Sequence, residues 1–267
     1  NRHIIYHQYK MRYQLIQPQH MPVKFKHPGS YQKMCHLVAS NIKDLVKGKG
    51  GKEYHIRPVI GLATGTTPLG VYEELKKMKN TNFSDTYTIN VDEYIGLEPE
   101  FNARLKGKEG YGFPQHPKSY YHYMTEHLFR DINFKRSFFP GESQTDTFDS
   151  LIAAMGGIDI QILGIGTNGH IGFNEPGTSR DSLTHVVDLT ESTIKDNSRF
   201  FDTINDVPKR AITMGIESIM RAKRIYLLAQ GKHKKDIFDK AFKGEITPDV
   251  PASYLQEHSD CTVMYCD

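Results

Sequence analysis

Hydrophobic positions along the chain switch repeatedly between strand-like runs and helix-like spacing. Short apolar runs predict buried strands at 58–63, 86–91, 158–163, 224–229 and 261–265. Apolar residues at helical spacing predict helices at 29–47, 68–75, 118–130, 148–155, 211–222, 236–242 and 251–258. Alternation of this kind is typical of an α/β fold. We therefore expect a single domain built on a Rossmann-like, open, mostly parallel sheet with helices on both faces.

Two stretches of the chain do not fit this alternation. Residues 1–28 show no sustained period and are rich in His, Gln and Tyr, so we expect an N-terminal extension before a main domain at 29–267. Residues 98–115 are polar and rich in Gly, which predicts a surface insertion. The chain contains no apolar stretch as long as a membrane span, and its N-terminus lacks the apolar region of a secretory signal.

Composition narrows the class of protein further. The net charge is +3 and the basic residues are scattered, which argues against a nucleic-acid partner. Cys35, Cys261 and Cys266 lack metal-ligand and C-x-x-C spacing, so they predict neither a disulfide framework nor a zinc site. A reducing compartment fits these cysteines best. We expect a cytoplasmic protein that has no membrane partner.

Residues 158–177 combine the clearest strand with the most reactive side chains. An apolar run ends in glycines and then presents Asn168, His170, Asn174 and Glu175 on one loop. In open α/β sheets, ligands bind at the carboxyl edge of the strands. This stretch therefore predicts a central strand that carries a reactive loop to that edge.

The glycines of this loop also match a dinucleotide-binding pattern. Gly164, Gly166 and Gly169 fit G-x-G-x-x-G, and Asp188 follows where a ribose-binding acid could lie. That pattern requires a helix directly after the glycines, whereas Pro176 and further glycines interrupt any helix here. We therefore reject a nicotinamide cofactor.

The turn after the first core strand is a candidate anion site. Thr64-Gly65-Thr66-Thr67 leads into Pro68, which suits a first helical residue, and Thr66 or Thr67 could cap the helix. A helix N-terminus offers free N–H groups and a positive dipole end to an anion. A plain capped turn is the alternative, and the G-K-[ST] of a Walker loop is missing.

Three charged residues at other predicted element ends have open roles. Asp92 follows the strand at 86–91, where an acid can be a turn former or a general base. Arg199 could pair with an acid or bind phosphate through two parallel hydrogen bonds. Lys234, at a strand-to-helix turn, could meet an anion, although most such lysines are only solvated.

Five separated motifs occur in the order that one enzyme family shows. They are GLATGTTP at 61–68, NVDEYIGL at 90–97, HPKSYYHYM at 116–124, GIGTNGHIGFNEPG at 164–177 and NSRFF at 197–201. From about residue 29 to 267 the chain resembles the glucosamine-6-phosphate deaminases, in a wider group that includes 6-phosphogluconolactonase. The resemblance implies conversion of glucosamine 6-phosphate and water to fructose 6-phosphate and ammonia, in amino-sugar catabolism and without cofactor or metal.

The resemblance also assigns roles to residues of this chain. It implies a catalytic group of Asp92, Asn168, His170 and Glu175, and a phosphate-binding group of Thr64, Gly65, Thr66, Thr67, Arg199 and Lys234. Many members carry Asp where this chain has Asn168. Because an amide cannot titrate, we expect Asn168 to orient His170 and Glu175 by hydrogen bonding.

Several further expectations follow from the resemblance. Residues 172–199 could move as a lid, and the chain looks like the shorter type of member without allosteric regulation, which predicts hyperbolic kinetics. The partner is a small sugar phosphate, and a homo-oligomer is left open. Two alternatives remain, namely a 6-phosphogluconolactonase-like hydrolase and a sugar-phosphate sensor without catalysis.

Overall fold

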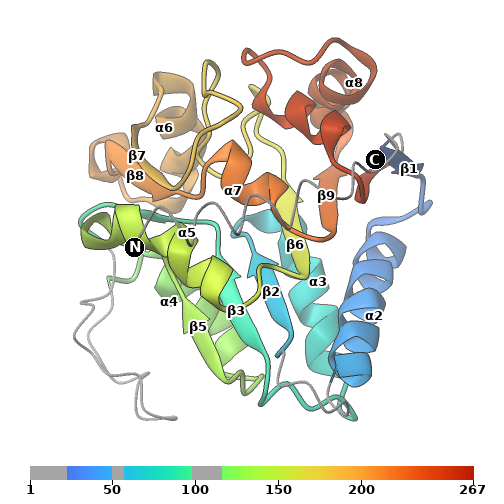
Figure 1. Ribbon diagram of the computed structural model, residues 1–267. Helices are drawn as coiled ribbons and strands as arrows, with labels where there is room; N and C mark the ends of the chain where they lie inside the picture. The colour runs from blue at the N-terminus through green and yellow to red at the C-terminus, as the bar shows by residue number, and fades with distance from the viewer. Residues whose placement is uncertain (1–22, 50–56, 98–115) are drawn as a thin grey trace, which may run out of the picture.

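A parallel sheet of seven strands forms the centre of the computed structural model, which describes residues 23–49, 57–97 and 116–267 (Figure 1). All neighbouring strands in this sheet are parallel, in the order β1-β10-β9-β6-β2-β3-β5. The strands are β1 (Lys24–Lys26), β2 (Val59–Leu62), β3 (Tyr87–Asn90), β5 (Arg136–Phe138), β6 (Ile160–Gly164), β9 (Ile225–Gln230) and β10 (Cys261–Cys266). The expected Rossmann-like sheet is confirmed.

Helices cover both faces of this sheet. One face packs against α2 (Tyr31–Lys49), α3 (Thr66–Lys77) and α4 (Tyr120–Met124), which continues as the π-helix η2 (Thr125–Phe129). The other face packs against α5 (Thr145–Ala154), α7 (Ile216–Met220), α8 (Lys235–Lys243) and the 3-10 helix η7 (Pro251–Glu257). Successive strand side chains point to opposite faces. In β9, Leu227 therefore lies in one core and Leu228 in the other.

A second sheet, which the hydrophobic pattern did not predict, lies over the carboxyl edge of the first. It is antiparallel, in the order β4 (Asp92–Tyr94), β8 (Arg210–Thr213) and β7 (His185–Asp188). The helix expected at 211–222 is therefore wrong over its first part, and only α7 is helical. Pairing with β4 and β7 overrides the local helical spacing, because strand formation depends on neighbours distant in sequence.

Other differences concern the ends of elements. Part of the expected N-terminal extension is the edge strand β1, paired with β10. Residues 1–22 of that extension and the expected insertion at 98–115 lie outside the described residues. The helix expected at 118–130 becomes π-helical after Met124, and the one expected at 251–258 is a 3-10 helix. Four further 3-10 turns and the helix α6 complete the described elements: η3 (Glu142–Gln144), α6 (Glu191–Asn197), η4 (Ser198–Phe200), η5 (Ile204–Asp206) and η6 (Lys232–Lys234).

The strand order places a crevice between β2 and β6. After β2 the chain builds outward through β3 and β5, and it then returns to add β6, β9 and β10 on the other side of β2. Ligands bind at such a reversal, beyond the carboxyl ends of the strands. The loop after β6 and the turn after β2 meet at this point, as the sequence pattern indicated.

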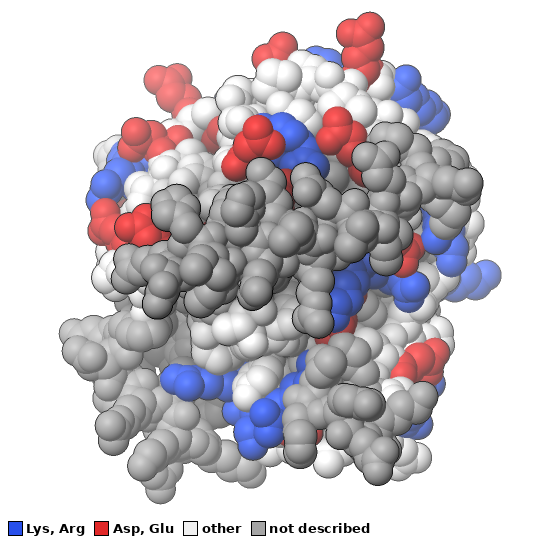
Figure 2. All heavy atoms as spheres, in the orientation of Figure 1, with Lys and Arg blue, Asp and Glu red and all other residues white. Residues whose placement is uncertain are grey.

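Charged side chains of both signs lie side by side over the upper part of the face in Figure 2. Arg180 forms ion pairs with Glu217 at 2.7 Å and with Glu257 at 2.9 Å. None of the helices in the described ranges is both long and apolar enough to cross a membrane.

The close approach of β2 and β6 yields a first prediction. Gly61 pairs directly with the fully buried Gln161, and a Cβ at position 61 would lie 2.0 Å from Gln161 Oε1. We expect Gly61→Ala to lower the free energy of unfolding by about 1–3 kcal/mol, because overpacking a core costs that much. Adding Gln161→Ala should recover part of the loss in urea titrations. Gly141→Ala, where nothing lies within 4 Å of the new Cβ, is the control. Equal stability of Gly61→Ala and wild type would contradict the packing described.

Candidate active site

The carboxyl edge of the sheet encloses a cavity of about 850 Å³. Eight of the ten predicted site residues line it, namely Thr64, Gly65, Thr66, Thr67, Asp92, His170, Arg199 and Lys234. The other two, Asn168 and Glu175, contact His170. Asp92 and His170 therefore lie at the same edge of the sheet and line the same cavity.

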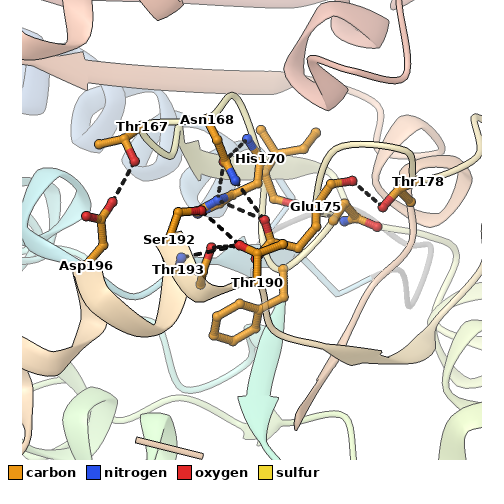
Figure 3. Close-up of polar contacts among 12 residues, drawn as sticks. Thr167, Asn168, His170, Glu175, Thr178, Thr190, Ser192, Thr193 and Asp196 are labelled. Atoms are coloured by element: carbon orange, nitrogen blue, oxygen red, sulfur yellow. Dashed lines mark hydrogen bonds and ion pairs between the residues drawn. The ribbon is translucent and has the colours of Figure 1, made fainter. Parts of the chain in front are cut away.

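His170 is held by the amide of Asn168 (Figure 3). Asn168 Oδ1 accepts the backbone N–H of His170 at 3.2 Å, and Asn168 Nδ2 donates to Glu175 Oε2 at 2.9 Å. These two partners fix which end of the amide is oxygen. His170 Nδ1 lies 2.7 Å from the same Oδ1 and must therefore carry the proton. Glu175 Oε2 is also 3.7 Å from His170 Nδ1.

This tautomer leaves the other ring nitrogen, Nε2, with its lone pair. Within the described part of the chain no hydrogen bond to Nε2 is formed, and the ring lines the cavity. Burial lowers the pKa of His170 from its ordinary value, and the positive charge of Lys234 acts in the same direction, whereas Glu175 opposes them. The imidazole is therefore neutral near pH 7 and can accept a proton at Nε2.

Glycines let the reactive loop pack this tightly. A Cβ at Gly166 would lie 2.3 Å from His170 Nε2, so the ring occupies the place of a side chain. A Cβ at Gly172 would lie 2.7 Å from Val91 Cγ1 and 3.5 Å from Asp92 Oδ2. The loop thus passes directly against Asp92. No helix follows Gly169 before α6, which agrees with the rejection of a dinucleotide site.

Asp92 is the acid that lies against the loop of His170 at the cavity wall. The residue is 7% exposed, and burial raises the pKa of its carboxyl from 3.8 to about 7. Aromatic rings form an apolar wall of the cavity beside it. The ring of Tyr120 lies parallel to that of Phe173 with centroids 5.8 Å apart, and the ring centroids of Tyr94 and Tyr120 are 4.8 Å apart. A carboxyl with such a pKa can both take and return a proton near neutral pH.

Glu93, the next residue, is a positioning residue that sequence reasoning missed. Its fully buried carboxyl accepts the backbone N–H groups of Tyr94, Tyr120 and Tyr121 at 2.8, 2.9 and 2.8 Å. Burial raises its pKa to about 8, although these donors act in the opposite direction. Glu93 therefore joins β4 to the start of α4. The second acid of the Asp-Glu-Tyr sequence was the only available signal.

The turn after β2 is the anion-binding candidate. Helix α3 begins at Thr66, its N-cap is Gly65 with φ 103°, and no side chain caps it, so the expected cap by Thr66 or Thr67 is wrong. The positive φ of Gly65 turns the chain sharply, and this leaves the N–H groups of the first turn without a side-chain partner. The hydroxyl of Tyr123 donates to Gly65 O at 2.9 Å and fixes this turn.

Two cations reach the same cavity from other elements. Lys234 ends η6, and burial lowers the pKa of its ammonium group. Arg199 lies on η4, with its guanidinium 4.7 Å from the centroid of the Phe200 ring. The cavity is thus lined by an acid–base part, formed by Asp92 and His170, by a cationic part, formed by Arg199 and Lys234, and by the first turn of α3.

The fold and the cavity define an α/β protein with a candidate acid–base site and a candidate anion site at a helix N-terminus in one cavity. The chain belongs to the family of glucosamine-6-phosphate isomerases and 6-phosphogluconolactonases, whose model matches residues 30–264.

Relatives and solved structures place the chain within this family. A glucosamine-6-phosphate deaminase of Lachnoclostridium phytofermentans is 49% identical over 219 residues, which is 78% of this chain and 86% of the relative. One of Geobacillus sp. is 42% identical over 253 residues, covering 91% and 92%. A solved monomeric glucosamine-6-phosphate deaminase matches with a TM-score of 0.79 and 40% identity, covering 92% of this chain and 97% of that one. A 6-phosphogluconolactonase of Thermotoga maritima, at 19% identity and a TM-score of 0.63, shares the fold and covers 91% and 98%.

Because Asp92 is buried, we expect its replacement by asparagine to raise the free energy of unfolding by an amount that depends on pH. Because its folded pKa of about 7 exceeds the ordinary 3.8, the folded state binds the proton more tightly than the unfolded state. Wild-type stability therefore falls as the pH rises from about 4 to 8, and Asp92→Asn lacks this contribution. The variant should match wild type at pH 4 and exceed it by up to about 4 kcal/mol at pH 8, at about 1.36 kcal/mol per pKa unit. Urea titrations at both pH values test this, and a pH-independent difference would contradict it.

Proposed function

We propose that this chain is a glucosamine-6-phosphate deaminase, which converts glucosamine 6-phosphate and water to fructose 6-phosphate and ammonia in amino-sugar catabolism. One observation carries the proposal: a neutral imidazole with a free Nε2 and a separate carboxyl of raised pKa face one cavity. The reaction needs two such groups, because opening the sugar ring and moving a proton between carbons occur at different atoms. The close deaminase relatives support this assignment over other reactions of the family.

His170 performs the ring opening in this proposal. Its Nε2 accepts the proton of the anomeric hydroxyl and returns a proton to the ring oxygen as the C1–O5 bond breaks. The imidazolium that forms between these transfers is stabilised by the Glu175 carboxylate at 3.7 Å. Asn168 keeps the ring oriented throughout, and it does not exchange protons.

Asp92 performs the isomerisation. Its carboxylate takes the proton from C2 of the open aldose while the C1 oxygen gains the proton that the C2 ammonium group gives up, which yields an enolamine. The carboxyl then returns its proton to C1. The product is the imine at C2 of the ketose. Water adds to this imine, and the resulting carbinolamine releases ammonia and leaves the C2 carbonyl of fructose 6-phosphate. The aromatic wall of Tyr94, Tyr120 and Phe173 keeps bulk water from Asp92 during the proton transfer.

The phosphate binds at the cationic part of the cavity. The N–H groups and hydroxyls of Thr64 to Thr67 donate to its oxygens, and Arg199 and Lys234 supply positive charge. Binding energy from this remote group places C1 and C2 between His170 and Asp92. Residues 172–199, which contain the last part of the reactive loop and α6, remain the candidate lid.

The oligomeric state, the regulation and the cellular compartment of this protein remain predictions. A structural relative is described as monomeric, and this favours a monomer over the homo-oligomer left open by the sequence. We expect hyperbolic kinetics without an allosteric effector. Three free cysteines suit a reducing compartment such as the cytoplasm.

Ammonia release is the direct test. Purified protein should form ammonia and fructose 6-phosphate in equal amounts from glucosamine 6-phosphate. Asp92→Asn should lower kcat by about 10²–10⁴-fold, the usual contribution of a general base, while KM changes little. The matched control is Asp188→Asn, which removes an exposed acid at the end of β7.

Three outcomes would contradict the proposal. Equal ammonia release by wild type and Asp92→Asn would remove Asp92 as the base. Hydrolysis of 6-phosphogluconolactone without ammonia release would favour the lactonase alternative. Binding of glucosamine 6-phosphate without turnover in wild type would favour the sensor alternative.

A further inference from the structure

An acidic side chain lies among the cations of the cavity, and the mechanism above does not use it. Asp196, near the end of α6, lines the cavity together with Arg199 and Lys234. An acid in a site for a dianion is unexpected, because its charge repels the ligand. Its presence here therefore calls for a role.

The carboxylate of Asp196 is fixed by the reactive loop. Thr167 Oγ1 donates a hydrogen bond to Asp196 Oδ2 at 2.5 Å, and Figure 3 shows the two side chains pointing toward each other. Thr167 directly precedes Asn168, which orients His170. The bond thus holds a negative charge at the cavity wall, beside the imidazole and the phosphate-binding cations.

The charge of Asp196 acts on both parts of the site. Burial lowers the pKa of Lys234, and Asp196 opposes this shift, whereas Arg199 reinforces it. Asp196 likewise acts to raise the pKa of His170. The carboxylate therefore interacts with the same ammonium group that the phosphate of a ligand would need.

We propose that Asp196 weakens the phosphate end of the site: its carboxylate competes with the bound phosphate for the ammonium group of Lys234 and thereby favours release of the phosphorylated product. The inference rests on the phosphate-binding part of the proposed function and not on the chemistry at C1 and C2. It makes Asp196 a residue that sets affinity for phosphorylated ligands.

Binding of inorganic phosphate tests this without turnover. Asp196→Asn removes the charge and keeps an acceptor for Thr167, so the variant should bind inorganic phosphate about ten-fold more tightly in calorimetric titrations. Its KM for glucosamine 6-phosphate should fall, and kcat should not rise. Glu191→Gln is the matched control, since Glu191 is an exposed acid in the first turn of the same helix. This control should bind phosphate as wild type does.

A second variant separates charge from the hydrogen bond. Thr167→Val removes the donor and keeps the Asp196 charge, so phosphate binding should not become tighter. If Asp196→Asn binds phosphate no more tightly than wild type, or if both variants weaken binding alike, Asp196 is only a structural partner of Thr167 and the inference is wrong. Tighter phosphate binding without any ammonia release would sustain the inference while sinking the proposed function. Ammonia release by wild type together with unchanged phosphate binding in Asp196→Asn would support the proposed function and contradict the inference.

Discussion

The side-chain amide of Asn168 is the constraint on which the site depends. Its oxygen accepts from two groups of His170, and its nitrogen donates to Glu175. An amide has one accepting and one donating end, so these partners leave a single arrangement of protons. That arrangement puts the His170 proton on Nδ1 and frees Nε2 for the ligand. A carboxylate in this place could make the same contact to the ring, but it could not donate to Glu175.

Burial gives the second acid–base group its useful pKa, and the sheet topology provides that burial. Asp92 lies where β3 leads into the small antiparallel sheet, and the loop after β6 crosses against it at Gly172. Desolvation there destabilises the charged form of the carboxyl and so raises its pKa. The folded state is therefore less stable at a pH at which this carboxyl is charged. Asp92 thus comes from the start of β4 and His170 from the loop after β6, both at the carboxyl edge of one parallel sheet.

The sequence predicted the parts of this architecture that depend on local pattern. Apolar runs located five of the seven parallel strands, all but the edge strands β1 and β5. The motif from 164 to 177 carried His170 with its partners. The small sheet was missed, because the pairing of β8 with β4 and β7 joins segments far apart in the chain. The same reason hid Glu93, whose hydrogen-bond partners on α4 are distant in sequence. Asp196 carried no motif, and only the fold brings it to Thr167.

The protonation state of His170 tests the central claim most directly. Nitrogen-15 NMR of histidine-labelled protein, with the His170 signals assigned by their loss in His170→Gln, distinguishes a protonated ring nitrogen from a bare one. At pH 7 we expect a neutral ring with the proton on Nδ1 and none on Nε2. A neutral ring that carries its proton on Nε2, or an imidazolium at that pH, would contradict the account.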